Sequence, residues 1–320
     1  MRILILVAIP LVIWLSTFGW QSSKFSLKNL DEKKIATAQH LKETVKVISS
    51  DIGNRSYADY NNLKKTAEYI KNGFLALGYK TRILSYEIDK VRFDNIIAER
   101  EGHPESDEIV IIGAHYDSCS NPGADDNASG IAALMELAAL LKDEPLKRKL
   151  KFIAFTNEEP PFFTTERMGS RVYTKEAKKQ GEQIKGAVIL EMLGYYSEKP
   201  NSQHYLPFLG PFYPNRANFV TIVGNFPSTK LVGQLISYFR KVTDFPVAGL
   251  ISPSFIPGVY FSDHWSFWKE RYPAVMITDT AYLRSPHYHQ STDLPDTLDY
   301  ERMAFVIQGL KEAIVKFVNE

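Results

Sequence analysis

Four short apolar segments constrain the fold of this chain more than any other feature. Short segments without polar alternation are typical of strands that are buried on both faces of a largely parallel sheet. Two β-rich runs, at residues 80–88 and 92–98, precede them and predict two further strands. The four apolar segments are residues 109–112, 150–155, 187–190 and 274–277.

Stretches with helical spacing of apolar residues flank these strands. Residues 128–141 are rich in Ala and Leu and follow the capping residues Asp126 and Asn127, which predicts the crossover helix of a βαβ unit. The other predicted helices are residues 29–50, 59–77, 168–179, 228–242 and 300–318. Residues 205–214 and 248–260, rich in Pro, Gly and aromatics, are predicted to be long loops. We therefore expect one α/β domain over residues 23–320, with a central, mainly parallel (mixed) β-sheet flanked by helices.

Composition excludes several classes of protein. The chain has 320 residues with 44% hydrophobic side chains, and 38 Lys and Arg against 37 Asp and Glu give a net charge of +1. Such a chain can bury a large core, so disorder of the bulk is excluded. The sequence has no repeat, low-complexity tract or basic block, and nucleic acid is therefore not an expected partner. The single cysteine, Cys119, rules out an intrachain disulfide.

The N-terminus predicts export. Residues 3–20 form an almost unbroken apolar run between Arg2 and Lys24, without the polar face of a surface helix. Such a run is typical of a signal peptide or an N-terminal membrane anchor, and we assign residues 1–22 to one of these two. The run is just long enough to span a bilayer and has no obvious cleavage site, which favours the anchor. The rest of the chain is expected to be exported, as a periplasmic or extracellular domain that is free or membrane-anchored.

Metal-binding residue types follow each of the four apolar segments. Open α/β sheets bind ligands beyond the carboxyl ends of their strands, so we expect these side chains to meet at one edge of the sheet. Carboxylates and imidazoles that converge there would repel one another or stay unpaired unless a cation neutralised them. Two imidazoles and three carboxylates suit zinc, with one carboxylate bridging two ions about 3.5–4 Å apart and another free to act as a base. In chain order the residues are His115, Asp117, Asp125, Glu158, Glu159, Glu191, His287 and His289.

Six short motifs between residues 93 and 295 resemble those of a known enzyme family. In order and spacing they are similar to the motifs of the co-catalytic zinc exopeptidases of metallopeptidase family 28. That family includes leucyl-type aminopeptidases and, on the same fold, glutaminyl cyclases. The motifs are GAHYDS at 113–118, GADDNASG at 123–130, NEE at 157–159, LEM at 190–192, SDH at 262–264, and His289 with Asp293 four residues later.

The resemblance implies a role for each residue of the site. Glu158 looks like the general base, and Asp117 would receive the second ring N–H of His115 and fix its tautomer. The peptide bond between Asp125 and Asp126 is expected to be cis. The implied metal ligands are His115 and Glu191 for one zinc, Glu159 and His289 for the other, and Asp125 as the bridge. Many aminopeptidases of the family have Asp where this chain has Glu191, but the longer carboxylate can still ligate zinc.

The resemblance implies the function of a di-zinc aminopeptidase, which hydrolyses the N-terminal peptide bond of peptides by means of a zinc-activated water. Two zinc ions per chain and peptide substrates are expected. Three alternatives stay open: a glutaminyl cyclase, which is an acyltransferase expected to hold a single zinc; a carboxypeptidase or deacylase of the sister group; and a non-catalytic binding ectodomain, as in transferrin receptors. The complete ligand set, including His115, favours hydrolysis.

Other residues near the motifs have weaker claims to a function. Asp263 and His264 are expected to be buried and structural, and His287 to diverge from His289. Cys119 is expected to be structural or incidental, because the proposed ligand sets are full without it. Aromatic residues near the motifs fit a substrate pocket and ordinary core packing about equally well. They are Phe162, Phe163, Trp265, Phe267 and Trp268.

Overall fold

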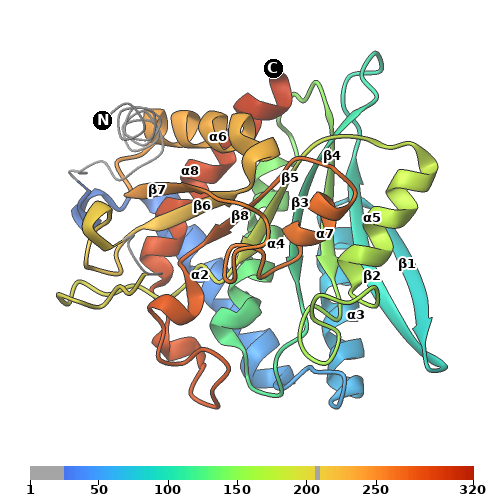
Figure 1. The fold of residues 1–320 in the computed structure, drawn as a ribbon, viewed down its shortest axis with the longest axis horizontal. Helices are drawn as coiled ribbons and strands as arrows, with labels where there is room; N and C mark the ends of the chain where they lie inside the picture. Colours follow the sequence, from blue (N-terminus) through green and yellow to red (C-terminus); the bar gives the residue numbers. More distant parts are fainter. Residues whose placement is uncertain (1–24, 206–209) are drawn as a thin grey trace, which may run out of the picture.

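A mixed β-sheet occupies the middle of the protein, with helices on both of its faces (Figure 1). The computed structural model of the protein describes residues 25–205 and 210–320. The strands within these residues are β1 (Lys80–Ile88), β2 (Val91–Arg100), β3 (Glu108–His115), β4 (Lys149–Phe155), β5 (Gln183–Glu191), β6 (Val220–Gly224), β7 (Val247–Ile251) and β8 (Ala274–Thr278). In the described residues they form one eight-stranded sheet in the order β1-β2-β4-β3-β5-β8-β6-β7.

The four predicted apolar segments lie in the four central strands of this sheet. β4, β3, β5 and β8 lie side by side in that order, and each neighbouring pair is parallel. β6 and β7 are parallel to each other, but β6 runs antiparallel to β8. On the other side, β1 and β2 are antiparallel and β2 is antiparallel to β4. The predicted α/β architecture is therefore confirmed, and the carboxyl ends of the central strands meet at one edge.

Alternating apolar residues hold the helices against the two faces of the sheet. The described helices are α2 (Glu32–Lys46), α3 (Tyr60–Ala76), α4 (Gly130–Leu141), α5 (Gly169–Gln180), α6 (Thr229–Val242), α7 (His264–Lys269) and α8 (Tyr300–Asn319). In β3, Val110 and Ile112 join a large core cluster with residues of α2, α3, α4, α6 and α8. Ile109 and Ile111 point the opposite way, into a smaller cluster with residues of α5 and α7. Burial of each such aliphatic side chain contributes roughly 1.5–3 kcal/mol to the free energy of folding, relative to leaving it exposed to water.

Two strands and one short helix differ from the sequence prediction. β7 lies largely within residues 248–260, so the prediction of a continuous loop there is wrong. β6 and β7 are each five residues long, and they become strands because β6 pairs with both β7 and β8. The six-residue α7 begins at His264 of the SDH motif and was likewise not predicted. β6 and β7 extend the sheet beyond β8.

The predicted signal peptide or anchor, residues 1–22, lies outside the described residues. Within the part of the chain that the structure describes, no helix combines the length and apolar character needed to cross a membrane. The ring of Phe25 packs edge-on against Phe245 and Phe305, with centroid distances of 4.8 and 4.9 Å. This contact places residue 25 beside α8.

Candidate metal centre

Acidic and imidazole side chains meet at the carboxyl ends of the central strands. His115 ends β3, Glu191 ends β5, and Glu159 follows β4. Two further segments complete the cluster: η3 (Ala124–Ser129), which leads into α4, carries Asp126, and the loop between β8 and α8 carries His289. The His289 side chain is 28% exposed, whereas the other members of this cluster are buried.

Asp126 lies between two histidine–glutamate pairs. Its Oδ1 is 3.4 Å from Nε2 of His115, which is 3.3 Å from Oε2 of Glu191. Its Oδ2 is 3.2 Å from Nε2 of His289, which is 3.3 Å from Oε2 of Glu159. The two oxygens of one carboxylate therefore face two different groups of nitrogen and oxygen donors. A carboxylate that bridges two metal ions requires this arrangement.

Asp125, the residue predicted to bridge, points elsewhere, and that prediction is wrong. Its Oδ1 accepts a hydrogen bond from the backbone N–H of Gly194 at 2.8 Å. The cis peptide bond also lies one residue later than predicted, between Asp126 and Asn127. Asp293 accepts the backbone N–H groups of both Asp125 and Asp126, at 2.9 and 3.1 Å, while their side chains point in different directions. The motif spacing alone does not distinguish two adjacent acids.

Asp117 contacts both His115 and the segment after β4. Its Oδ1 is 3.5 Å from Nδ1 of His115, which is the neighbour that the sequence motif predicts for it. The same carboxylate accepts the backbone N–H groups of Glu158 and Glu159 at 3.1 and 3.0 Å. Asp117 thus fixes the backbone of two functional candidates as well as facing the ring of a third.

The surrounding carboxylates favour protonation of both histidines. Burial alone would lower the pKa of His115, but Glu191 and other nearby carboxylates raise it well above 6.5. Burial also opposes a charge on His289, yet hydrogen bonds to Asp126 and Glu159 raise its pKa to about 10. Without a metal, both histidine rings would be protonated on both nitrogens, and so positively charged, at neutral pH. The acidic cluster therefore requires positive charge, which divalent cations can provide in place of these protons.

The two glutamates after β4 also have raised pKa values. Burial, supported by the neighbouring Asp126, raises the pKa of Glu159 to about 8. Burial is also the main cause that raises the pKa of Glu158 well above 4.5; His115 opposes this shift, whereas Glu159 and Glu191 add to it. Pairs of carboxylates with perturbed pKa values in a cavity are typical of catalytic sites.

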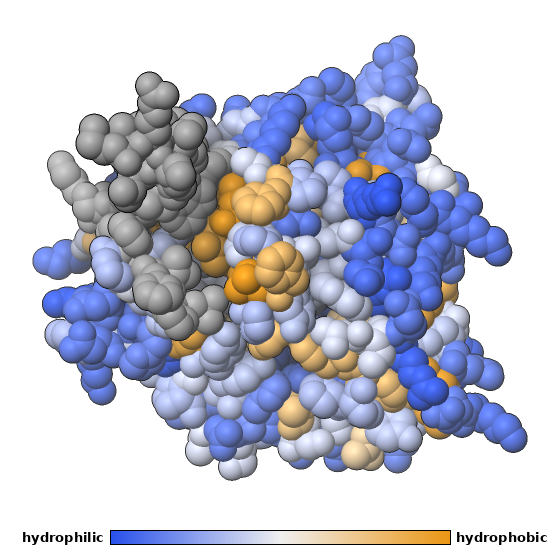
Figure 2. Space-filling view, viewed as in Figure 1, coloured by the Kyte–Doolittle hydropathy of each residue, from blue (hydrophilic) through white to orange (hydrophobic). Residues whose placement is uncertain are grey.

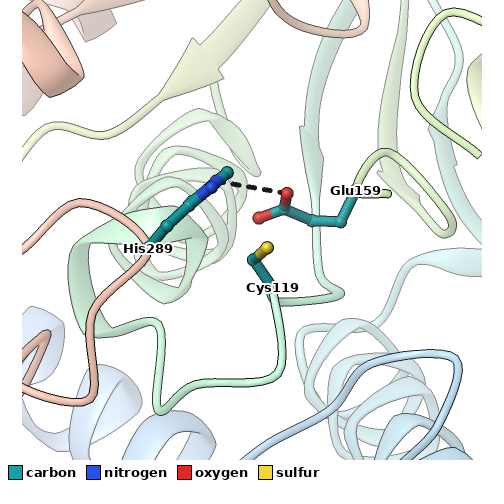
Figure 3. A group of neighbouring side chains, drawn as sticks. All are labelled: Cys119, Glu159 and His289. Atoms are coloured by element: carbon teal, nitrogen blue, oxygen red, sulfur yellow. Dashed lines mark ion pairs between the residues drawn. The ribbon is translucent and has the colours of Figure 1, made fainter. Parts of the chain in front are cut away.

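The donor atoms of the cluster fit zinc. Zinc binds imidazole nitrogen and carboxylate oxygen at about 2.0–2.2 Å. Oε1 of Glu159 is buried and has no hydrogen-bond partner among the described residues, which leaves it available to a cation. Two groups of three residues have ligand atoms that all lie within 4.8 Å of one another. These groups are His115, Asp126 and Glu191, and Cys119, Glu159 and His289 (Figure 3).

Cys119 belongs to the second of these groups. Figure 3 shows the side chains of Cys119, Glu159 and His289 converging from three separate segments of the chain. Burial and then the nearby carboxylates raise the pKa of the Cys119 thiol to about 12. In the metal-free protein the thiol is therefore protonated at neutral pH.

Arg55 is a buried cation behind the site, and sequence reasoning missed it. Its Nε, Nη1 and Nη2 donate to the carbonyl oxygens of Tyr116, Pro122 and Gly123 at 2.8, 2.5 and 2.6 Å. Burial lowers its pKa to about 10, although nearby carboxylates, Asp293 first, oppose this shift. Arg55 lies in the loop before α3 and in none of the recognised motifs, so no sequence signal marks it.

The remaining candidates lie near the cluster without joining it. Asp263 is fully buried, and burial raises its pKa to about 7. Nε2 of the buried His264 lies 2.7 Å from the carbonyl oxygen of Val259. Nδ1 of His287 lies 2.9 Å from Oγ1 of Thr292. His287 therefore diverges from the neighbouring histidine ligand candidate, as predicted.

A largely apolar cavity of about 230 Å³ opens beside the acidic cluster. On the face shown in Figure 2, hydrophobic side chains gather near the middle, in the region where Figure 1 places β6, β7 and β8. These strands contribute Val223, Leu250 and Met276 to the cavity. The wall of the cavity that borders the acidic cluster consists of Asp126, Glu158, Glu159, Glu191 and His289.

Aromatic side chains make up much of the rest of this cavity. They include Phe163, Phe219, Phe261, Tyr282 and Tyr288. Phe163 is therefore the member of the predicted aromatic set that lines the cavity. Phe162 and Phe267 are buried in the core, and Trp265 and Trp268 border a separate surface depression.

The fold and the site together define a metallopeptidase-like α/β protein, and comparison with known proteins agrees. Residues 95–314 match the model of peptidase family M28, and the chain belongs to this family. The resemblance inferred from the sequence motifs is thereby confirmed.

Several curated relatives each cover most of the chain. Uncharacterized protein YfbL of Escherichia coli (strain K12) is 38% identical over 285 residues, which are 86% of this chain and 87% of the relative. A probable leucine aminopeptidase 1 of Trichophyton verrucosum is 27% identical over 292 residues, 85% of this chain and 70% of the relative.

Solved structures share the fold. BSAP, a zinc aminopeptidase from Bacillus subtilis, superimposes with a TM-score of 0.72 at 16% identity, over 88% of this chain and 95% of that one. A glutaminyl cyclase from Porphyromonas gingivalis superimposes with a TM-score of 0.67 at 16% identity, over 88% and 98% of the two chains. The fold therefore accommodates both hydrolysis and cyclisation.

Proposed function

We propose that the protein is a di-zinc aminopeptidase that hydrolyses the N-terminal peptide bond of peptides. The observation that carries this proposal is the position of Asp126, whose two carboxylate oxygens face two separate histidine–glutamate pairs. When bound, zinc supplies Lewis-acid polarisation of the substrate carbonyl and a lowered pKa for water at the site. In the proposed site His115 and Glu191 hold one ion, Glu159 and His289 hold the other, and Asp126 is shared.

Glu158 is the proposed general base. Its carboxylate is buried beside the cluster, whereas that of the adjacent Glu159 is directed to His289 at 3.3 Å. The two neighbouring glutamates can therefore have different roles. Burial raises the pKa of Glu158, which suits a group that accepts a proton from the attacking water and returns it to the leaving amine.

Asp117 is the proposed positioning residue for this base. It binds the backbone N–H of Glu158 and of Glu159, so it orients both residues at the end of β4. It also faces the ring of His115 and stabilises the tautomer in which Nε2 is free to bind an ion.

The cavity supports a preference for peptides with an apolar N-terminal residue. Its walls away from the ligands are mainly aromatic and aliphatic, and burial of an apolar side chain there releases water from both surfaces. The leucine aminopeptidase names of several relatives agree with this preference.

A glutaminyl cyclase is the second candidate, because a cyclase shares the fold. The resemblance leads us to expect a single zinc in a cyclase. Here His115 and Glu191 form a second donor group with Asp126, and all three are buried. This complete second group favours the aminopeptidase.

The deciding experiment is metal analysis of the purified protein together with three peptide substrates. These have a free N-terminal Leu, an N-acylated terminus and an N-terminal Gln. We expect two zinc ions per chain and release of Leu. One zinc with loss of ammonia from the Gln peptide would indicate a cyclase, and cleavage of the acylated peptide would indicate a deacylase.

A further inference from the structure

Cys119 lies next to the ion that Glu159 and His289 would hold, and the proposed function gives it no role. Its Sγ, an oxygen of Glu159 and a nitrogen of His289 are all within 4.8 Å of one another. The three side chains point into the same space (Figure 3). The thiol is therefore close enough for a small movement to bring it into a shared coordination sphere.

Glu159 independently indicates a ligand in this space. Its side chain is only 4% exposed, and one oxygen, Oε2, faces His289 at 3.3 Å. The other oxygen, Oε1, is buried and has no hydrogen-bond partner among the residues that the structure describes. An unpaired buried carboxylate oxygen is costly, and a cation beside it would remove that cost.

The loop that carries Cys119 is held in place by buried contacts. Arg55 donates hydrogen bonds to Tyr116 on one side of Cys119 and to Pro122 and Gly123 on the other. These bonds link a buried guanidinium to both ends of the loop, so the backbone on each side of Cys119 is held in place.

A sulfur donor would make the two metal positions unequal. The His115 position has three protein donors, because Glu191 and Asp126 complete it. With Cys119, the His289 position has four, because Glu159 and Asp126 also contribute. Tetrahedral zinc with four protein ligands is closed, whereas zinc with three retains an open place.

We propose that Cys119 is a zinc ligand that closes the His289 position, so that the His115 position alone stays open to substrate and water. This inference rests on the proposed di-zinc function. On binding, the S–H bond breaks, a zinc–sulfur bond forms and the proton passes to solvent. A thiolate is a soft donor, so the closed position should prefer zinc to magnesium or manganese.

X-ray absorption at the zinc edge tests the inference directly. The wild-type protein should show a sulfur neighbour at about 2.3 Å, with about one sulfur for every two zinc ions. Cys119→Ser should lose this neighbour. The matched control His115→Ala removes a donor from the other position and should retain it, at about one sulfur per zinc.

Cobalt substitution and thiol labelling give independent readouts. Cobalt-loaded wild-type protein should show a thiolate-to-cobalt absorption band that Cys119→Ser lacks. Because Cys119 is the single cysteine, a thiol reagent reports on it alone in the unmutated protein. Labelling should be about tenfold slower or more with zinc than after chelation, since a metal-bound thiolate is a poor nucleophile.

The outcomes separate this inference from the proposed function. Two zinc ions with only nitrogen and oxygen neighbours would overturn the role of Cys119 and leave the di-zinc aminopeptidase intact. A protein that binds no zinc would overturn both. Circular dichroism of Cys119→Ser checks its fold, and the labelling of wild-type protein decides the question if that variant does not fold.

Discussion

Oδ1 of Asp117 accepts a hydrogen bond from the backbone N–H of Glu158 at 3.1 Å, and the same oxygen lies 3.5 Å from Nδ1 of His115. One buried acid therefore contacts the backbone of the proposed base and the ring of a proposed ligand. Replacing its charge should disturb both.

Asp117→Asn should weaken zinc binding by about 10–100-fold, because the neutral amide is a poorer partner for the His115 ring. Its NH2 group would also face a backbone N–H that the carboxylate now accepts, so one of these two hydrogen bonds would be lost. Zinc affinity can be measured by competition with a chelator. Asp89→Asn, which changes an exposed acid of the β1–β2 turn, is the control and should bind zinc normally. Equal affinities in the two variants would contradict the role of Asp117.

The adjacent acids Asp125 and Asp126 provide a matched pair of variants. Asp126→Asn should lose both ions, because two cations about 3.5–4 Å apart need a shared anion between them. Asp125→Asn should keep both, since an amide oxygen can still accept the Gly194 N–H. Metal analysis of both purified variants makes the comparison. Loss of metal from Asp125→Asn alone would restore the original sequence prediction.

Glu158→Gln should keep the fold and both zinc ions but lose about 10²–10⁴-fold in turnover, with little change in KM. The amide has nearly the same shape and cannot accept the proton. Glu159→Gln should instead reduce the zinc content, because Glu159 faces His289. Steady-state kinetics and metal analysis of the two variants separate the base from the ligand. Near-normal turnover of Glu158→Gln would contradict its role and make Asp263 the next candidate for the general base.

The metal-free protein should lose stability as the pH rises. The pKa of His289 is about 10 in the folded protein against 6.5 ordinarily, so its stabilising contribution is present below 6.5 and is lost as the pH rises through 10. Glu159, with a pKa of about 8 against 4.5, acts in the same direction over its own range. Melting temperatures of chelated protein should therefore fall over this pH range.

Zinc-loaded protein should not follow that trend, because protons compete with the metal for the same atoms and zinc binding tightens as the pH rises. Thermal melts of both forms in one buffer series make the comparison. Parallel curves would show that the histidines and the metal do not share ligand atoms.

We also propose that the protein is exported, on the basis of the apolar run at residues 3–20. Carbonate-washed membranes should retain the full-length protein if this run is an anchor, and a cleaved leader should release a shortened soluble form outside the cytoplasm. Removing residues 1–22 should abolish either outcome. Intact full-length protein in the soluble cytoplasm would contradict export.

The central sheet and most of the candidate metal cluster could be predicted from the sequence because their signals are local. Each of the four central strands is a short apolar run, and His115, Glu159 and Glu191 follow such runs directly. Parallel pairing then brings their ends together. The choice between Asp125 and Asp126 could not be predicted, since it depends on how Asp293 and Gly194 bind the loop.

Features that depend on tertiary contacts were also missed. β6 and β7 are short and weakly marked in the sequence, and each becomes a strand only beside its neighbours in the sheet. Arg55 is distant in sequence from the loop that it holds, and Cys119 is 170 residues before His289, which it meets only through the tertiary fold. Neither residue has a sequence pattern that indicates its position.

The three strands β6, β7 and β8 have a consequence for how enzymes on this fold can diversify. β6, β7 and β8 supply Val223, Leu250 and Met276 to the cavity, whereas the proposed ligands come from the ends of β3, β4 and β5 and from two loops. In the proposed aminopeptidase these three strands shape part of the pocket for the N-terminal side chain without supplying a ligand or the base. Substitutions at Val223, Leu250 and Met276 should therefore change which N-terminal residue the proposed enzyme prefers while its ligands and base stay in place, a route by which specificity could evolve without loss of catalysis.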